Sequence, residues 1–338
     1  MVNRFASSAG VAAALLAGCG GSQLPIDAPG AMQQSRAIAT QAKYGGSWML
    51  PEAKNEALVY ASADRYRVEV YSLFKGNHVG ELSGLPAEPL GLCNDPSGNI
   101  YVTMQGDGES LSQSYVYEYA HGGTHPIATF HDPGLANGCA VDPTTGNLAV
   151  TNYFGSSGTN GNIAVYDSAQ EPPKIYADVN FPRFLWCTYD SAGNLFADGA
   201  SSIVDELPSG ADALTEIQLS KSITSGSVQW LGKYLVIAGI VGTRGPNPIH
   251  KVRVSGGRGD VHGTILLSSR NDRSATGDIQ FWVEQRTIIG PGHVQGGNGL
   301  LQFWKYPKGG MATEVIKPRP KAIFSGVTVS QLLSVTNR

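Results

Sequence analysis

The stretch GCAVDPTTGNLAVTN, residues 138–152, has two weaker copies elsewhere in the chain. They are GLCNDPSGNIYVT at residues 91–103 and WCTYDSAGNLFADGA at residues 186–200. In each copy an apolar segment is followed by Asp with Pro or Ser, then by Gly-Asn, then by a second apolar segment. Because Gly adopts a positive φ without strain and Asp accepts local backbone N–H groups, each copy predicts a β-hairpin.

The hairpins recur at a nearly constant interval. Asn147 follows Asn99 by 48 residues, and Asn194 follows Asn147 by 47 residues. Each hairpin is followed by two further apolar segments around a polar turn, as in residues 115–130. Four strands in about 47 residues have the size of a propeller blade, a unit that needs neighbouring blades to bury its faces.

The count of repeats predicts an all-β fold, a six-bladed β-propeller with four-stranded antiparallel blades. Degraded copies at residues 227–239 and 278–290 bring the count to five blades, and the two chain ends supply the sixth. The innermost strand of this first blade has two candidates, Ser325–Ser330 and Ser47–Leu50. We expect the C-terminal segment to complete the first blade, because this closes the ring and removes the exposed edges of an open sheet.

The N-terminal residues 1–18 have the features of a signal peptide, with Arg4 before an apolar run. The run ends in LAGC, which resembles the lipobox of bacterial lipoproteins. The resemblance implies that Cys19 is lipidated and attaches the chain to a membrane. An ordinary secretory signal with an incidental cysteine is the alternative.

The export signal places the remaining chain outside the cytoplasm. Residues 19–45, rich in small and polar side chains, are expected to form a flexible tether, and residues 46–338 the propeller. We expect an exported protein that is lipid-anchored in the bacterial cell envelope, at the periplasmic face of the outer membrane or at the cell surface.

Composition excludes some classes of function. Charged residues make up only 15% of the chain and the formal net charge is -3, so we expect no binding of nucleic acid, which requires a basic face. After the leader, no apolar run is long enough to span a bilayer. We expect a monomer.

Three cysteines, Cys93, Cys139 and Cys187, lie at matching points of the three best repeats. We expect all three to be small core residues of equivalent strands. A disulfide between neighbouring repeats is the alternative, since an exported chain meets an oxidising compartment. No C-x-x-C pair occurs, so the sequence does not predict a zinc site of that type.

With these hairpins and the six-fold count, the chain resembles propellers of the NHL-repeat and SMP-30/gluconolactonase-like kind, and among them uncharacterised bacterial lipoproteins. The lactonase-like branch implies Ca²⁺ or another divalent cation in the central channel, held by oxygen ligands. The alternative function is therefore a metal-dependent lactonase-like hydrolase. The candidate ligands at loop ends are Glu88, Asn94, Asn137, Asn152 and Asp198.

Our leading expectation is a binding or interaction scaffold without catalysis and without a cofactor. Its ligand, a protein, a peptide or a glycan, is expected at the mouth where loops enter the inner strands and leave the second strands. Aromatic and cationic side chains gather in these loops, although they also suit ordinary loop or core positions. The candidate binding residues are Arg183, Trp186, Asn137, Tyr153 and Arg244.

Overall fold

The structure is a computed structural model of the 338-residue chain. It describes residues 46–106, 114–158, 160–199, 203–239, 246–269, 280–294, 298–318 and 322–331. The predicted signal peptide and tether therefore lie outside the described residues, and so does Cys19. None of the helices in the described ranges has the length and apolar character that a membrane crossing requires.

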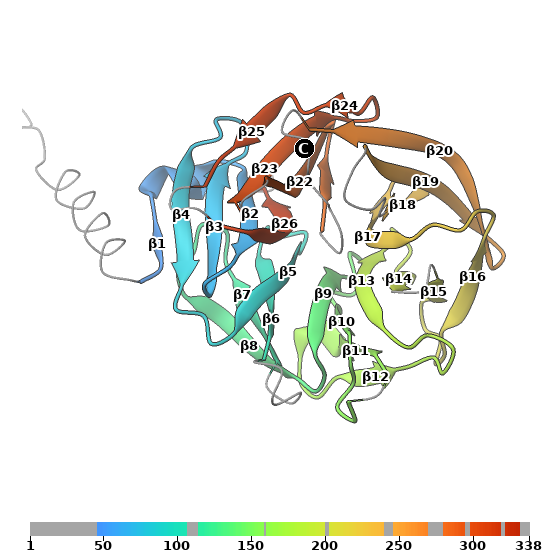
Figure 1. The fold of residues 1–338 in the computed structure, drawn as a ribbon. Coiled ribbons are helices and arrows are strands. Elements are labelled where there is room, and N and C mark those ends of the chain that lie inside the picture. Colours follow the sequence, from blue (N-terminus) through green and yellow to red (C-terminus); the bar gives the residue numbers. More distant parts are fainter. Residues whose placement is uncertain are drawn as a thin grey trace, which may run out of the picture.

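The described chain is all-β with almost no helix. Its sheets stand around a common axis in a propeller-like arrangement (Figure 1). The described residues form only two short 3₁₀ helices, η1 (Pro51–Asn55) and η2 (Asp167–Ala169).

Four of the sheets are antiparallel, and each is written here in its order of hydrogen-bonded strands. The first sheet consists of β1 (Trp48–Met49), β4 (His78–Ser83), β3 (Arg67–Ser72), β2 (Leu58–Ala63) and β26 (Phe324–Ser330). The second consists of β5 (Glu88–Asn94), β6 (Ile100–Gln105), β7 (Ser114–Tyr119) and β8 (Pro126–Asp132). The third consists of β9 (Ala136–Val141), β10 (Leu148–Asn152), β11 (Asn162–Tyr166) and β12 (Lys174–Tyr176). The fifth consists of β21 (Trp282–Glu284), β22 (Thr287–Val294), β23 (Asn298–Lys305) and β25 (Glu314–Ile316).

The fourth sheet has nine strands and joins two antiparallel runs at the rim of the ring. The first run consists of β13 (Phe184–Tyr189), β14 (Leu195–Gly199), β15 (Val204–Leu207) and β16 (Thr215–Leu219). The second consists of β17 (Ser225–Leu231), β18 (Tyr234–Gly239), β19 (Asn247–Ser255) and β20 (Arg258–Ser268). The outer strands β16 and β20 pair in parallel, and β24 (Gly310–Met311) pairs with the other end of β20.

The three predicted Gly-Asn hairpins are present. Gly98, Gly146 and Gly193 all have positive φ, at 88°, 77° and 82°. In the first turn Asp95 accepts the backbone N–H and the side-chain N–H of Asn99 through its two carboxylate oxygens, both at 2.9 Å. The third turn has the same two bonds, from Asn194 to Asp190, whereas in the longer second turn Asp142 accepts groups of Thr144 and Thr145. In each turn the carboxylate thus accepts hydrogen bonds from its own loop.

The predicted C-terminal closure of the first sheet is confirmed. β26 pairs antiparallel with β2 over the whole length of both strands. The rival segment forms β1 instead, which pairs with β4 at the opposite edge of the same sheet. The C-terminal strand takes the innermost position because its buried residues Phe324, Val327 and Val329 fill the interface with the fifth sheet.

The expectation that all three cysteines are unpaired core residues is wrong for two of them. Cys93 and Cys139 form a disulfide that links β5 to β9, with their Cα atoms 5.6 Å apart. The alternative of a link between neighbouring repeats therefore holds for this pair. Cys187 is free and buried, as a core residue would be.

The free cysteine takes the same place in its repeat as Cys139 does in the preceding one. Cys93 lies one position nearer its turn, where the next repeat has Ala140, so the expected match of all three cysteines is wrong for Cys93. The Cys139 Sγ lies 3.9 Å from the carbonyl oxygen of Tyr101, and the Cys187 Sγ lies 3.9 Å from that of Ala149. Both sulfurs thus point back toward the preceding sheet. Burial raises the pKa of the Cys187 thiol, which keeps it protonated and poorly reactive.

Hydroxyl groups on the second strands of three sheets tie each sheet to the next one. Each hydroxyl is buried and donates to a backbone carbonyl of the next inner strand, so burying this polar group costs little free energy. These bonds fix the inner strands around the axis. They are Ser62 to Leu90 at 2.5 Å, Thr103 to Asn137 at 2.6 Å and Thr151 to Leu185 at 2.7 Å.

Candidate functional site

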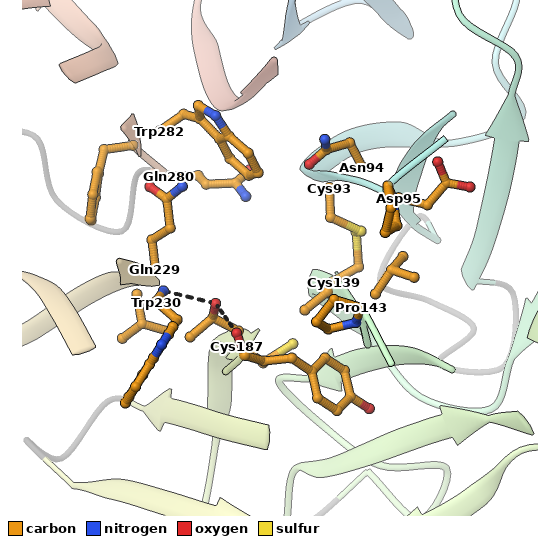
Figure 2. A pocket seen from close by; sticks show the side chains of 17 residues that line it. Cys93, Asn94, Asp95, Cys139, Pro143, Cys187, Gln229, Trp230, Gln280 and Trp282 are labelled. Atoms are coloured by element: carbon orange, nitrogen blue, oxygen red, sulfur yellow. Dashed lines mark hydrogen bonds between the residues drawn. A yellow bond between two sulfur atoms is a disulfide. The ribbon is translucent and has the colours of Figure 1, made fainter. Parts of the chain in front are cut away.

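A cavity with a volume of about 310 Å³ lies at the axis. Its lining comes from five inner strands and the residues next to them (Figure 2). Most of these residues lie just before the turn of a hairpin. The cavity therefore lies toward the mouth to which the inner strands run. The lining includes Cys93, Asn94, Asp95, Cys139, Gln229, Trp230, Gln280 and Trp282.

The disulfide forms one wall of the cavity. Cys93 and Cys139 contribute it from β5 and β9, and Cys187 lies farther along the same lining. In Figure 2 the two bonded sulfurs lie beside Asn94, facing the side of the cavity that Gln229 and Trp230 form. This wall is rigid and apolar, because the disulfide holds two inner strands together and offers no hydrogen-bond donor.

Two glutamine side chains cross between inner strands and bind backbone edges. The Gln280 Oε1 accepts the N–H of Leu92 at 2.9 Å, and the Gln280 Nε2 donates to the Leu92 carbonyl at 2.5 Å. The Gln229 Oε1 accepts the N–H of Val283 at 2.7 Å, and the Gln229 Nε2 donates to the Val283 carbonyl at 3.2 Å. Each carboxamide thus pairs with a strand edge as another strand would.

The side chain of Gln280 can reach β5 only because β26 has a glycine beside it. A Cβ at Gly326 would lie 2.2 Å from the Leu90 oxygen and 3.0 Å from the Gln280 Oε1. Any side chain there would push the Gln280 amide away from β5. Because the Gln280 backbone N–H also donates to the Ser325 carbonyl at 3.1 Å, this residue connects the fifth, first and second sheets.

The two indole rings at the cavity have already used their N–H groups. The Trp282 Nε1 donates to Glu284 at 3.3 Å, and the Trp230 Nε1 donates to the Gly232 carbonyl at 2.8 Å. Trp230 also stacks on Phe196, with ring centroids 5.2 Å apart, which holds it at the edge of the cavity. What these residues offer a ligand is therefore ring surface.

Asn94 supplies a polar group that is not used within the protein. Its half-buried amide points into the cavity in Figure 2, toward the ring of Trp282, and makes no hydrogen bond with any residue that the structure describes. Asp95 next to it is engaged, because both carboxylate oxygens accept N–H groups of Asn99. Among the residues that the structure describes, the lining contains no Lys, Arg or His, so this part of the cavity offers no cation to an anion.

The binding residues expected from the sequence lie toward the other end of the inner strands, where β9 and β13 begin and β10 ends. Arg183 lies over two rings there, with its Cζ 4.8 Å from the centroids of both Tyr153 and Phe154. Trp186 is 1% exposed and packs in the interface core together with Tyr153. Asn137 is buried and donates to the Leu185 carbonyl at 2.6 Å. Arg244 lies outside the described residues.

The candidate metal ligands are dispersed among local hydrogen bonds. Glu88 accepts the backbone N–H groups of Arg65 and Tyr66 at 3.0 and 3.4 Å. Asn152 donates to Asn162 at 2.8 Å, and Asp198 accepts the Trp186 N–H at 2.9 Å. Within the described ranges, no three His, Cys, Asp or Glu side chains form a group that could hold a metal ion.

A buried acid lies away from the cavity, on β15. Asp205 is 0% exposed, and neither of its carboxyl oxygens has a hydrogen-bond partner among the described residues. Burial, and to a lesser extent the charges of Asp178 and Glu216, raise the pKa of Asp205 to about 7. Folding therefore opposes ionisation of this group.

We predict that Asp205→Asn stabilises the fold at alkaline pH. The unfolded carboxyl group ionises near pH 4, whereas the folded one keeps its proton up to about pH 7. The folded state thus binds more protons between these values, and the wild type loses stability as the pH rises through them. The variant should gain up to about 4 kcal/mol at pH 8, which is about 1.4 kcal/mol for each pH unit between the two pKa values, and nothing near pH 4 in urea unfolding. Asp260→Asn, at an exposed site, is the control; an equal gain at both pH values would contradict the prediction.

The sequence pointed to Asn94, as a candidate metal ligand, and to the three cysteines, but not to the Gln and Trp residues of this cavity. Gln229, Gln280 and Trp282 belong to the degraded repeats, where the Gly-Asn signature is lost. A signal was present, because VQW at residues 228–230 and IQFW at residues 279–282 each place a Gln shortly before a Trp at the start of a degraded hairpin. A polar Gln among the apolar residues of such a segment indicates a side chain that does not pack in the hydrophobic core.

Comparison with known proteins provides no assignment. No protein-family model matches the chain, and no curated protein matches it either. Among solved structures 1118 chains match, so the arrangement of strands is a common one. One of them is hydrazine synthase of Kuenenia stuttgartiensis, 15% identical with a TM-score of 0.48; the match covers 69% of this chain and 66% of that chain, slightly less than two thirds of its length. This likeness concerns the arrangement of strands alone.

Proposed function

We propose that this chain is a binding protein of the bacterial cell envelope, and that its ligand occupies the cavity at the channel axis. The observation that carries the proposal is the cavity of about 310 Å³ itself, into which the unbonded Asn94 amide and the Trp282 ring point. Its volume is at the lower end of the range for small-molecule sites. The ligand is a small molecule, or an end or side chain of a peptide or glycan.

We infer six blades for the ring. This count treats the nine-stranded sheet as two blades joined through β16 and β20, and it is supported by the two antiparallel four-strand runs within that sheet. Kinship with NHL-repeat and SMP-30/gluconolactonase-like propellers is part of the same proposal, and it is supported by the Asp-x-x-Gly-Asn turns.

We propose attachment to the membrane through a lipid on Cys19, with residues 19–45 as the tether. The LAGC sequence supports this proposal, and so does the Cys93–Cys139 disulfide, because structural disulfides persist in oxidising compartments. Fractionation of cells that produce the full chain tests it. The wild type should sediment with membranes and Cys19→Ser should not; an equal distribution of both would contradict lipid anchoring.

Binding without catalysis fits the side chains of the cavity. General acid–base chemistry needs a titratable group that can reach the substrate. The acid of the lining, Asp95, is committed to the hairpin turn through both of its oxygens. The lactonase-like alternative with a bound divalent cation stays a prediction, since the described positions of its candidate ligands add nothing in its favour.

The experiment that tests the proposal fills the cavity. We expect Asn94→Phe to occupy the space in front of Trp282 and to weaken the binding of a small uncharged ring probe, benzyl alcohol, at least tenfold. Binding is measured by ligand-observed NMR on the soluble part of the chain from residue 46, with Trp fluorescence as a second readout. Thr129→Phe, which adds the same ring on the exposed outer strand β8, should bind the probe as the wild type does.

Two results would overturn the proposal. One is a wild type that binds no benzyl alcohol at millimolar concentration. The other is an Asn94→Phe variant that is folded by its thermal unfolding curve and still binds the probe like the wild type. In either case the cavity is not a binding site for small apolar groups.

A further inference from the structure

The inner strands present open edges to the axis. β5, β9, β13, β17, β21 and β26 each stand at one end of their hydrogen-bonded strand order, so each has one edge without a neighbouring strand in the described sheets. Figure 1 shows β5, β9, β13, β17 and β26 gathered around the centre. Such an edge offers backbone N–H and C=O groups to any partner with a matching donor and acceptor.

Two of these edges are already filled by carboxamides of the protein. Gln280 binds both the N–H and the C=O of Leu92 on β5, and Gln229 binds both groups of Val283 on β21. A carboxamide can do this because it carries an acceptor oxygen and donor N–H groups side by side. A carboxylate has only acceptors and would leave the carbonyl unpaired.

Two other edges at the same cavity carry no such group. Ala140 and Val141 on β9 and Thr188 and Tyr189 on β13 line the cavity, and no side-chain amide of the described residues binds their backbone. On β13, however, the Tyr189 carbonyl already accepts the Thr188 hydroxyl at 3.5 Å, which leaves β9 as the open edge. The Asn94 amide is available beside them, and the Trp282 ring lies across the cavity from it. The cavity therefore combines the open edge of β9, an unbonded amide and a flat apolar surface.

We propose that the cavity recognises an uncharged carboxamide that is attached to a flat apolar group. The ligand amide pairs with an open inner-strand edge or with Asn94, as the protein's own glutamines pair with theirs, and the apolar group lies against Trp282. The described part of the lining carries no Lys, Arg or His to pair with a carboxylate or phosphate, which favours an uncharged ligand. This inference rests on the proposed function and adds the chemical class of the ligand to it.

Two kinds of ligand carry a carboxamide next to a flat apolar group: a small aromatic amide and a peptide. Benzamide represents the first, and N-acetyl-phenylalaninamide represents the second. Both carry a carboxamide and a ring, but only the peptide amide adds a second amide group in extended geometry. Tighter binding of the peptide amide would identify a peptide as the ligand, whereas equal or weaker binding would identify a small amide.

The test compares probes of equal shape in the wild-type protein. We expect benzamide to bind at least tenfold more tightly than benzoate in calorimetric or NMR titrations, with methyl benzoate, which has acceptors but no donor, in between. Asn94→Leu, which keeps the size of the side chain but removes its amide, should lower this preference. If benzoate or methyl benzoate binds as tightly as benzamide, the amide inference fails. If benzamide fails to bind while benzyl alcohol binds, it also fails, and the proposed function stands; if no probe binds, both fail.

A second variant tests the pairing mode itself. Gln229→Ala removes one internal carboxamide and leaves the Val283 edge open, so its melting temperature should fall. Added propionamide should raise the melting temperature of Gln229→Ala more than that of the wild type, and propionate should not. An equal response of the two proteins to propionamide would contradict recognition of strand edges by amides.

Discussion

A chain that ends after Ala322, and therefore lacks β26, is expected to lose cooperative unfolding. β26 supplies the innermost strand of the first sheet, and its Phe324, Val327 and Val329 are at most 1% exposed. Burying three such side chains contributes about 6 kcal/mol, which is comparable with the whole stability of many domains. Near-UV circular dichroism during heating should show no sharp transition.

A matched truncation separates the strand from the residues beyond it. A chain that ends after Gln331 keeps all of β26 and removes only residues outside the described part. We expect it to melt like the full-length protein. If both truncated chains melt alike and near the full-length temperature, the C-terminal strand does not close the ring.

The second large effect concerns the disulfide. Replacing both Cys93 and Cys139 by Ala should lower the free energy of unfolding by up to about 4 kcal/mol, the chain-entropy value for a loop of this length. The two residues are 46 positions apart in the sequence. Urea unfolding of the double variant, beside the oxidised wild type, measures the loss. A difference below about 0.5 kcal/mol would show that the disulfide does not constrain the unfolded chain as proposed.

The repeat itself offers a rescue of this variant. Ala149 pairs with Ala140 across the hairpin, which puts Ala140 where Cys93 stands in the preceding repeat, and Cys187 points toward Ala149. Adding Ala140→Cys to the double variant should therefore form a new disulfide with Cys187. About 2 kcal/mol should return, because engineered disulfides often stabilise less than the entropy model predicts. Mass spectrometry under non-reducing conditions would reveal a missing link.

The local repeats were predictable, because the hairpin turn is a short-range device. Asp95, Gly98 and Asn99 lie within five residues and bind one another, so the turn is encoded where it forms. The C-terminal strand was predictable as well, since the segment before Ser330 repeats the pattern of an inner strand. The sequence left the cysteines with two alternatives, unpaired core residues or a disulfide. The choice depends on which neighbouring sheet each sulfur faces, and only the tertiary structure determines this.

The candidate site was not predictable in the same way. Gln229 and Gln280 bind Val283 and Leu92, which are 54 and 188 positions away in the sequence. No local sequence pattern predicts that a side-chain amide will bind a strand edge so far away in the sequence. The loops with aromatic and cationic residues, where we expected the ligand, pack on one another instead, as Arg183 does on the ring of Tyr153.

The sequence by itself determined the hairpins, the repeat and the strand that closes the ring, because each depends on residues close together or on a pattern that recurs. The tertiary structure alone decided which cysteines pair, which mouth of the channel holds the cavity and which polar groups there stay unbonded. These outcomes depend on the direction of side chains across the axis, where residues from five inner strands meet. Their contacts are set by the closed ring, and no single repeat contains the information that places them.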